Sequence, residues 1–438
     1  MVDEPGLLHL PESGRSSLVV SGARSKIVAR GRIDAAALSG RRLLALVRIG
    51  HEWDLLKWGL IDKSGAFVIE PVYHALSPFA CGLARFSASP LVRQYPTACF
   101  KGRDGKYDLF QSARGRFGYL GLGGEVALAP RFDSARSFSE GAAGAEVDGK
   151  WGFINANGTF VIPPKFDEVR DFVNGLAIAK SNGMCGFVDR SGSFVIEPRV
   201  DFLWEFSEGL ACAEIDGKYG YLDHRGAFAI EPRFDSAFDF VSGVARVVLD
   251  GRRCLIDANG SIIFQCSDKD EKVWGIAGGV AIVSRGEGPS YRGNYIDMKG
   301  RPILRDDSLN AQGSFSEGLG VVFRIKDGHR RYGYADLKGE VKIEPQYRLA
   351  RPFNDGLAQI GPAGSRLSGF ITKDGVFRIK PKFTHVGDFR NGLAKTRNDK
   401  EDMPVGMGQG KWGFIDSDGD VVISCQFDQA NDFEEIKT

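Results

Sequence analysis

The chain has 438 residues, of which 43% are hydrophobic and 31 are phenylalanine, so it can build a folded core and is not a disordered polypeptide. Its 57 Lys and Arg residues balance 56 Asp and Glu residues, so net charge gives no reason to expect nucleic acid or an anionic membrane as a partner. We find neither a signal peptide nor an apolar run long enough to span a membrane. We therefore expect a cytoplasmic protein by default, with export by a specialised secretion system left open.

Residues 1–40 form an N-terminal segment that we expect to be partly disordered. Residues 43–49 follow as an apolar run typical of a strand, and no partner strand precedes it. From residue 41 to residue 438 we expect a single domain built from repeats.

One sequence pattern recurs ten times, and five of its motif positions lie 34 residues apart. The pattern is clearest from Lys150-Trp151-Gly152 to Gly175. A fixed period makes a feature found in every unit more typical of architecture than of catalysis. The motif position is occupied by Gly59, Gly118, Gly152, Gly186, Gly220, Cys254, Asn294, Gly333, Gly369 and Gly413.

Each unit begins with two apolar runs joined by a turn such as Asp189 to Gly192, which predicts a β-hairpin. The second run reaches a proline, as at Pro198 and Pro232, so that strand must end there or follow a sheet edge. A Phe-x-x-Gly turn then leads to a third strand, such as 210–215. The sequence predicts an all-β tandem array of about ten units, each of ~34 residues and three short strands.

The Lys-Trp-Gly triplets that begin at Lys57, Lys150 and Lys411 resemble the bacterial WG-containing repeat (KWG repeat) family. The resemblance extends over about residues 41–438, although Tyr219 and Tyr332 replace the tryptophan in two units. It implies a β-repeat scaffold of mostly unassigned function, and it brings no catalytic residues.

Two arrangements of the units remain open. We favour an open or superhelical array, and a closed propeller-like ring is the alternative. In the ring, strand 43–49 would complete the C-terminal unit, which ends soon after Phe433 without a third strand.

We expect no catalytic, cofactor-binding or metal-binding residues, and therefore no enzyme. The six histidines are scattered, and phosphate-binding loops, nucleophile elbows and His-Glu-x-x-His motifs do not occur. The recurrent Asp of each hairpin turn is expected to cap that turn and not to bind calcium. Lys165, Arg199 and Arg233 are expected on an exposed, salt-bridged face. Cys185, Cys212 and Cys254 are expected in the core of a protein from a reducing compartment.

Segments that interrupt the period are better candidates for function, because insertions in repeat proteins form loops that often lie on the binding face. We predict insertions at 87–115, 267–273, 285–292, 326–331 and 397–409. The longest of them interleaves basic and aromatic residues. Its candidate partner-binding residues are Arg93, Tyr95, Phe100, Lys101, Arg103 and Lys106.

The sequence therefore favours a non-catalytic scaffold that binds another protein, in the role of an adaptor, an effector or a component of a defence system. The alternative is an array that binds carbohydrate or cell wall. That alternative requires Trp58, Trp151 and Trp412 to be exposed as stacking platforms. The identity of the partner and the oligomeric state are left open.

Overall fold

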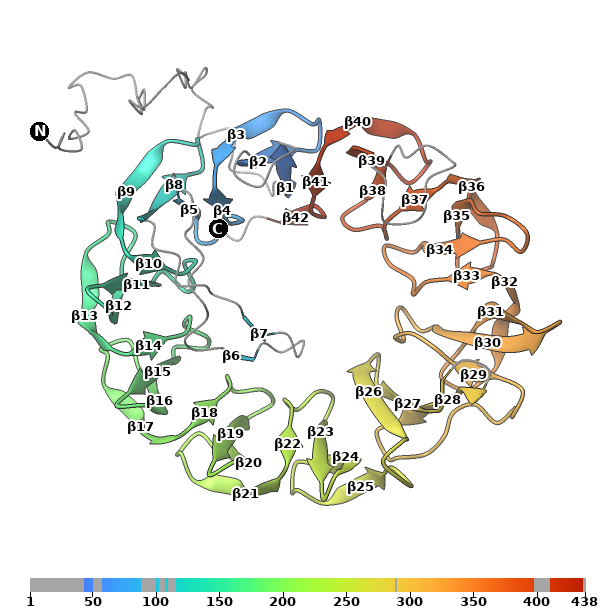
Figure 1. Cartoon of the computed structure of the whole chain (residues 1–438), viewed down its shortest axis with the longest axis horizontal. Coiled ribbons are helices and arrows are strands. Elements are labelled where there is room, and N and C mark those ends of the chain that lie inside the picture. The colour runs from blue at the N-terminus through green and yellow to red at the C-terminus, as the bar shows by residue number, and fades with distance from the viewer. Residues whose placement is uncertain are drawn as a thin grey trace, which may run out of the picture.

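The computed structural model describes residues 43–49, 57–87, 100–101, 107–108, 116–287, 290–397 and 410–435. Its elements are all strands, which form ten small antiparallel sheets and one separate two-stranded sheet. Figure 1 shows that the ten sheets follow one another around a ring, most of them with a two-residue strand on the inside and a longer strand on the outside. The all-β prediction and the number of units are therefore confirmed.

Eight of the sheets have four strands. In order from the inner to the outer strand they are β4(Ala75–Leu76)-β5(Leu83–Ser87)-β8(Phe117–Gly121)-β9(Val126–Phe132), β10(Ser134–Ala135)-β11(Ala143–Val147)-β12(Lys150–Ile154)-β13(Phe160–Phe166), β14(Glu168–Val169)-β15(Ala177–Ser181)-β16(Met184–Val188)-β17(Phe194–Val200), β18(Phe202–Leu203)-β19(Ala211–Ile215)-β20(Lys218–Leu222)-β21(Phe228–Phe234), β22(Ser236–Ala237)-β23(Val244–Leu249)-β24(Arg252–Asp257)-β25(Ile262–Gln265), β29(Asn310–Ala311)-β30(Gly320–Lys326)-β31(His329–Ala335)-β32(Val341–Tyr347), β33(Leu349–Ala350)-β34(Ala358–Gly361)-β35(Ser368–Ile371)-β36(Phe377–Phe383) and β37(His385–Val386)-β38(Ala394–Arg397)-β39(Trp412–Ile415)-β40(Val421–Phe427).

The other sheets differ in strand number. One has the three strands β26(Lys272–Ala277)-β27(Val280–Arg285)-β28(Arg292–Asp297), and the separate sheet pairs β6(Phe100–Lys101) with β7(Tyr107–Asp108). The closing sheet is β41(Gln429–Ala430)-β1(Leu43–Ile49)-β2(Lys57–Asp62)-β3(Phe67–Tyr73), and β42(Glu434–Glu435) also pairs with β1.

The closing sheet joins the two ends of the repeat domain. Val47 in β1 lies opposite Ala430 in β41, and Leu44 lies opposite Glu434 in β42. Strand 43–49 thus pairs with C-terminal strands, as only the ring alternative required. The protein is the closed ring that the sequence analysis held as its alternative, and not the open array that it favoured.

The sequence unit and the sheet are out of phase. The hairpin β12–β13 completes one sheet, whereas β14 and β15 of the same sequence unit begin the next one. A two-residue strand that the sequence analysis did not predict precedes each Phe-x-x-Gly turn, so a regular sheet has four strands where three were expected. Because every unit contributes to two sheets, its covalent chain ties neighbouring sheets together.

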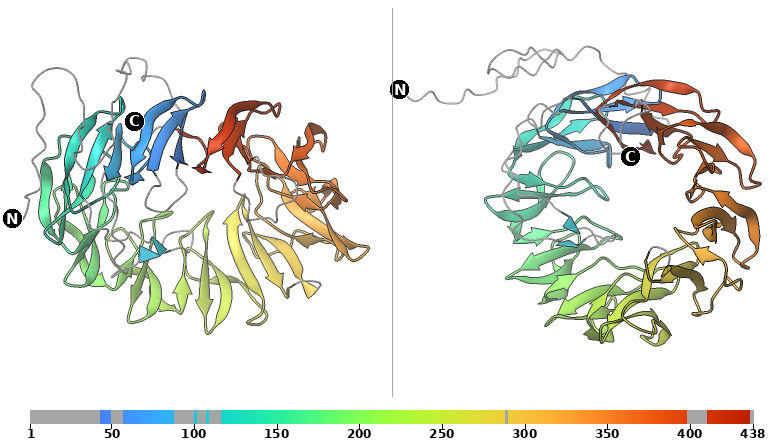
Figure 2. Two further views of the ribbon diagram at one scale, coloured as in Figure 1. Left: turned by 45° about the horizontal axis from the view of Figure 1, so that its top comes forward. Right: turned by 45° about the vertical axis from the view of Figure 1, so that its right-hand side comes forward.

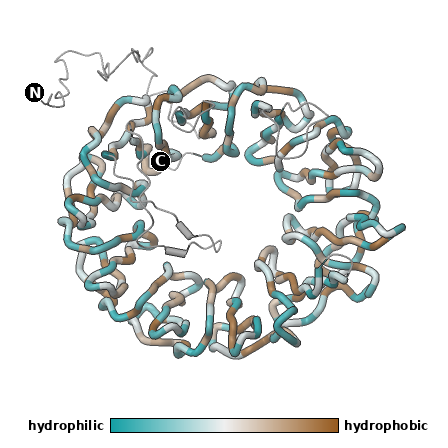
Figure 3. Tube along the Cα trace, viewed as in Figure 1, coloured by the Kyte–Doolittle hydropathy of each residue, from teal (hydrophilic) through white to brown (hydrophobic). Residues whose placement is uncertain are grey.

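The core lies between neighbouring sheets. Phe153 of one sheet packs on Phe172 of the next with ring centroids 4.6 Å apart, and the small residues Ala177 and Ala179 face the same cluster. A large side chain on one face meets small side chains on the facing sheet, so the sheets interlock without voids. Figure 3 shows hydrophobic segments in every sheet around the ring. Equivalent aromatic pairs, with centroids 4.6 to 5.0 Å apart, recur at Tyr119–Phe138, Phe187–Phe206, Tyr221–Phe240, Tyr295–Phe315, Tyr334–Phe353, Phe370–Phe389 and Phe414–Phe433.

The outer strands run along an edge, and their prolines lie within them. Pro163 and Pro164 are inside β13, on the side of the sheet that has no further strand. The cation after the proline reaches the next sheet: Lys165 Nζ donates to the Gly192 carbonyl at 3.0 Å, and Arg233 donates to the Gly260 carbonyl at 2.6 Å. Arg199 bonds the Gly226 carbonyl in the same way. These cations therefore link neighbouring sheets by bonding backbone carbonyls. The sequence analysis expected them to lie on an exposed, salt-bridged face instead.

Candidate functional site: the insertion face

The ring has two faces, and Figure 2 shows it obliquely in two tilted views. In a regular sheet the second and third strands are joined by a tight turn, such as Asp148-Gly149 between Val147 and Lys150. We call the face that carries these turns the insertion face. The Asp-x-x-Gly hairpin turns and the Phe-x-x-Gly turns lie at the opposite face, because strands in an antiparallel sheet alternate in direction.

The long connections of the chain leave from the insertion face. Residues 88–116 lie between β5 and β8, 286–291 between β27 and β28, and 398–411 between β38 and β39, each of which is a second-to-third-strand connection. The predicted insertion at 326–331 lengthens the hairpin β30–β31 at the same position. The link from β25 to β26, which contains 267–271, also crosses there. All five predicted insertions are therefore anchored at one face, a convergence that the sequence analysis did not infer.

The candidate partner-binding residues are placed only in part. Phe100 and Lys101 form β6, where they lie opposite Asp108 and Tyr107 of β7. The other four, Arg93, Tyr95, Arg103 and Lys106, lie outside the described residues. Their role in binding remains a prediction.

The lysine of the Lys-Trp-Gly motif has a structural partner at the insertion face. Lys150 Nζ lies 2.7 Å from Asp167 Oδ1, and Lys218 lies 2.7 Å from Asp235. The hydrogen bond from Lys150 and the Gly183 N–H lower the pKa of Asp167 below its ordinary value. Each pair ties the crossover between two sheets to the start of a third strand.

The motif tryptophans are covered from one side by cations. The guanidinium of Arg48 lies 5.5 Å from the ring centroid of Trp58, that of Arg136 lies 5.8 Å from Trp151, and that of Arg397 lies 5.3 Å from Trp412. The three indoles are half-buried and pack against the cores between sheets. They contribute to packing and cation–π stabilisation.

The hairpin β30–β31 carries a cluster of aromatic rings around Arg330. Its guanidinium lies 4.6 Å from the ring centroid of Phe323 and 5.1 Å from that of Tyr291. Arg330 also donates to Gln312 Oε1 at 3.1 Å, and the Tyr291 hydroxyl donates to the Ala311 carbonyl at 2.8 Å. We call Tyr291, Phe323, Arg330 and Gln312 the Arg330 cluster. It connects the three-stranded sheet to the sheet that follows it.

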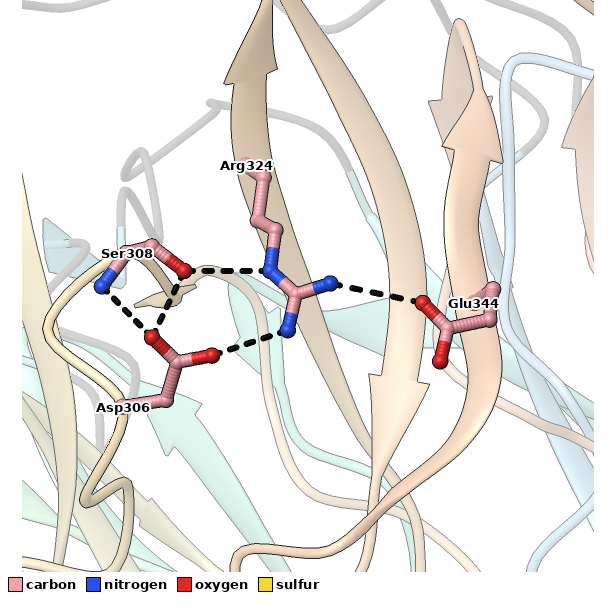
Figure 4. Close-up of polar contacts among 4 residues, drawn as sticks. All are labelled: Asp306, Ser308, Arg324 and Glu344. Atoms are coloured by element: carbon pink, nitrogen blue, oxygen red, sulfur yellow. Dashed lines mark hydrogen bonds and ion pairs between the residues drawn. The ribbon is translucent and has the colours of Figure 1, made fainter.

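A second polar group on the same hairpin is drawn in Figure 4. Arg324 lies between Asp306, at 2.8 Å, and Glu344, at 3.3 Å. The hydroxyl and the N–H of Ser308 donate to Asp306 and, with Arg324, lower the pKa of this carboxyl to about 2. The group fixes the segment that takes the place of the missing fourth strand.

In the described part of the chain, side chains suited to binding a partner are easier to identify than side chains suited to chemical reaction. Burial raises the pKa of the Cys185 thiol to about 11 and that of Cys266 to about 12, which keeps both protonated at neutral pH. Among the described residues no three His, Cys, Asp or Glu side chains gather as a metal site. No helix suited to crossing a membrane occurs in that part of the chain.

The strand pairings define a closed, propeller-like ring of ten small antiparallel sheets. The model of the WG containing repeat family matches residues 58–87, 117–151, 151–185, 186–219, 219–252, 332–360, 369–401 and 412–435, which together are more than half of the chain. The protein therefore belongs to the WG containing repeat family. None of these matches falls on residues 253–331, which include the three-stranded sheet.

Comparison with solved structures finds matches of low sequence identity, with TM-scores below 0.5. A eukaryotic initiation factor matches at 12% identity and TM-score 0.41 over 90% of this chain and 96% of that one. The tricorn protease matches at 10% identity and TM-score 0.25, over 87% of this chain and 44% of that one. Hsv2 of Kluyveromyces lactis matches at 9% identity and TM-score 0.30 over 67% and 96%. A comparison with curated proteins gives no match.

Proposed function

We propose that this protein is a non-catalytic scaffold that binds another protein through its insertion face. The observation that carries the proposal is that the five insertions, which are far apart in the sequence, are anchored at one face of the ring. Loops held by a rigid framework are where binding residues concentrate in proteins. Such a scaffold would serve as an adaptor, an effector or a component of a defence system, in the cytoplasm or after specialised export.

The interlocked sheets support this function because they fix the distances between the loops. Among the described residues, eight of the ten joints between neighbouring sheets have an aromatic pair, several have a cation on the outer edge, such as Lys165, and sequence units contribute strands to two sheets. The loops can therefore contact a partner together without the entropy cost of first being ordered relative to one another.

Deletion of residues 88–112 tests the proposal. We expect the thermal transition to stay close to that of the wild-type chain, because this segment lies between β5 and β8 and is not part of a regular sheet. Recovery of a partner from the native cell by affinity capture should be lost. The matched control is Leu337→Ser, which changes a side chain that is 51% exposed in a turn at the opposite face. Undiminished recovery by the deletion variant would refute the proposal.

The alternative function, binding of carbohydrate or cell wall, depends on the motif tryptophans. It requires that Trp58, Trp151 and Trp412 present a free ring face, and it predicts that replacing them by leucine abolishes retention on cell-wall polysaccharide. The cations that lie over the three rings favour the protein-binding proposal.

A further inference from the structure

The inner strand of the three-stranded sheet is paired more continuously than the other inner strands. The strand β26 has six residues, because the pair Ile276–Ala281 joins Lys272 and Val273 to the pair Ala277–Val280. In eight other inner strands the equivalent last pair, such as Ser139–Ala142, is an isolated bridge beyond a two-residue strand. Among the described residues β26 pairs with β27 alone, so its other edge faces the inside of the ring (Figure 1). An edge strand of this length presents unpaired N–H and C=O groups to a further strand.

A large aromatic side chain in a β-bulge of β26 is exposed to solvent. Val273 lies opposite Val283 and Ile276 lies opposite Ala281, so Trp274 and Gly275 together face a single residue. The side chain of Trp274 is 49% exposed, whereas Trp204 at the equivalent position of another inner strand is 9% exposed. Bulges commonly re-aim a side chain at a functional site in this way.

The exposed indole is held in one orientation. Its Nε1 donates to Ser284 Oγ at 2.7 Å, and Lys272 Nζ lies 5.7 Å from the ring centroid. Lys272 is itself 3.7 Å from Glu287, in the insertion between β27 and β28. A tryptophan fixed in this way loses little side-chain entropy when a partner covers it, which is a property of binding hot spots.

The surroundings of Trp274 favour an extended polypeptide as the occupant. An extended segment that pairs with β26 would satisfy the N–H and C=O groups at its edge, and an apolar side chain of that segment would cover the indole of Trp274. The edge lies inside the ring and not on its rim, so the rigid sheets of a second copy of the ring do not reach it (Figure 1). A flexible segment of another protein can enter from the insertion face, where Glu287 lies beside Lys272 of the strand.

We propose that β26 is a docking strand: an extended segment of a partner protein pairs with its free edge in β-sheet geometry and buries an apolar side chain against Trp274. This inference rests on the proposed function, since it names how the bound partner is held.

Selection of short random peptides tests the docking strand. A displayed library is panned on the full chain, and the peptides recovered are measured against wild type and Trp274→Ala. We expect binding to Trp274→Ala to be weaker by about tenfold or more, as for loss of a hot-spot residue. The matched control is Val195→Ala, which removes a side chain that is 50% exposed on the outer strand β17. Its affinity should be unchanged, and both variants should keep the wild-type thermal transition.

The geometry of the bound peptide supplies a second measurement. N-methylation of successive peptide bonds should abolish binding at alternate positions only, because every second N–H of an added strand points to the edge. Hydrogen exchange of residues 272–277 should slow in the complex. If no recovered peptide requires Trp274, or if the peptides are proline-rich and indifferent to N-methylation, the docking strand is refuted.

The outcomes separate this inference from the proposed function. If Trp274→Ala recovers the cellular partner as well as wild type while the 88–112 deletion does not, the scaffold function stands and the docking strand is wrong. If the wild-type chain recovers no partner yet binds peptides through Trp274, the proposed function fails and the docking strand stands.

Discussion

Gly152 and its equivalents are glycines because the outer strand crosses them closely. A Cβ atom on Gly152 would lie 2.4 Å from the carbonyl oxygen of Ile162, and a bulge separates the pairs Trp151–Phe166 and Phe153–Ile162. Where Cys254 replaces the glycine, it pairs directly with Gln265 and the outer strand has only four residues. The motif glycine is thus required by backbone contact, not by ligand binding.

The change Gly152→Ala should destabilise the protein by about 1–3 kcal/mol, because the contact is with backbone and cannot be relieved by a rotamer change. The matched control is Gly275→Ala, where an added Cβ meets nothing within 4 Å. Urea unfolding of the two variants measures the difference. Equal midpoints would contradict this account of the motif.

Asp306 gives one site on the chain a defined response to acid. Its folded-state pKa of about 2 is below the unfolded value of about 3.9, so its contribution to stability is complete above pH ~5 and is lost as pH falls toward 2. The difference in unfolding free energy between wild type and Asp306→Asn should therefore be constant from neutral pH down to about 5 and vanish near pH 2. Urea titrations over that range measure it. Asp307→Asn, at an exposed neighbouring residue, controls for loss of one negative charge.

At the scale of the element, neighbouring sheets bury large side chains against one another. Phe172 is buried against Phe153 of the preceding sheet, and the cluster around them contains residues from both sheets. In the three-stranded sheet, no fourth strand among the described residues pairs with β28. There the side-chain oxygen of Asn294 accepts from the N–H of Leu304, and the side-chain amide donates to the Leu304 carbonyl, both at 2.9 Å. One amide thus takes over the pairing of an absent outer strand.

The change Phe172→Ala should cost about 3–5 kcal/mol, since it removes a fully buried ring from a joint between sheets. The matched control is Val173→Ala at the next residue, which is 38% exposed and should change stability by about 0.5 kcal/mol or less. Thermal and urea unfolding compare the two. A small effect at Phe172 would mean that buried aromatic rings do not stabilise the contact between neighbouring sheets.

At the scale of the whole molecule, closure depends on a pairing between residues that are almost the entire domain apart. The inner strand β41 and the second strand β1 belong to one sheet although they lie at opposite ends of the described chain. Closure removes the two exposed terminal sheets that an open array would have to cap.

A designed disulfide tests closure directly. Val47→Cys with Ala430→Cys places two thiols at directly paired positions of β1 and β41, and mild oxidation should link them. The control pair is Val47→Cys with Ala350→Cys, because Ala350 holds the equivalent position in another sheet, opposite Ile360. Peptide mapping identifies the bond. Failure of the first pair, or equal yield from both, would contradict the closed ring.

The sequence alone determined the all-β class, the number of units and the hairpins. These features depend on local chemistry: period, turn residues such as Asp189 and Gly192, and prolines that cannot donate. The family resemblance was available at the same level, from the Lys-Trp-Gly triplets.

Only the tertiary structure decided what depends on contacts between distant residues. Ring closure rests on the small rotation between neighbouring sheets, which no single unit encodes, and on the pairing of Val47 with Ala430. The assembled ring also decides how each sequence unit is divided between two sheets. The direction of the strands in these sheets places the connections that carry the insertions on one face. Trp274 gave no signal in the sequence, because the exposure of a side chain depends on which residues pack around it in the folded ring: Trp204 at the equivalent position is buried.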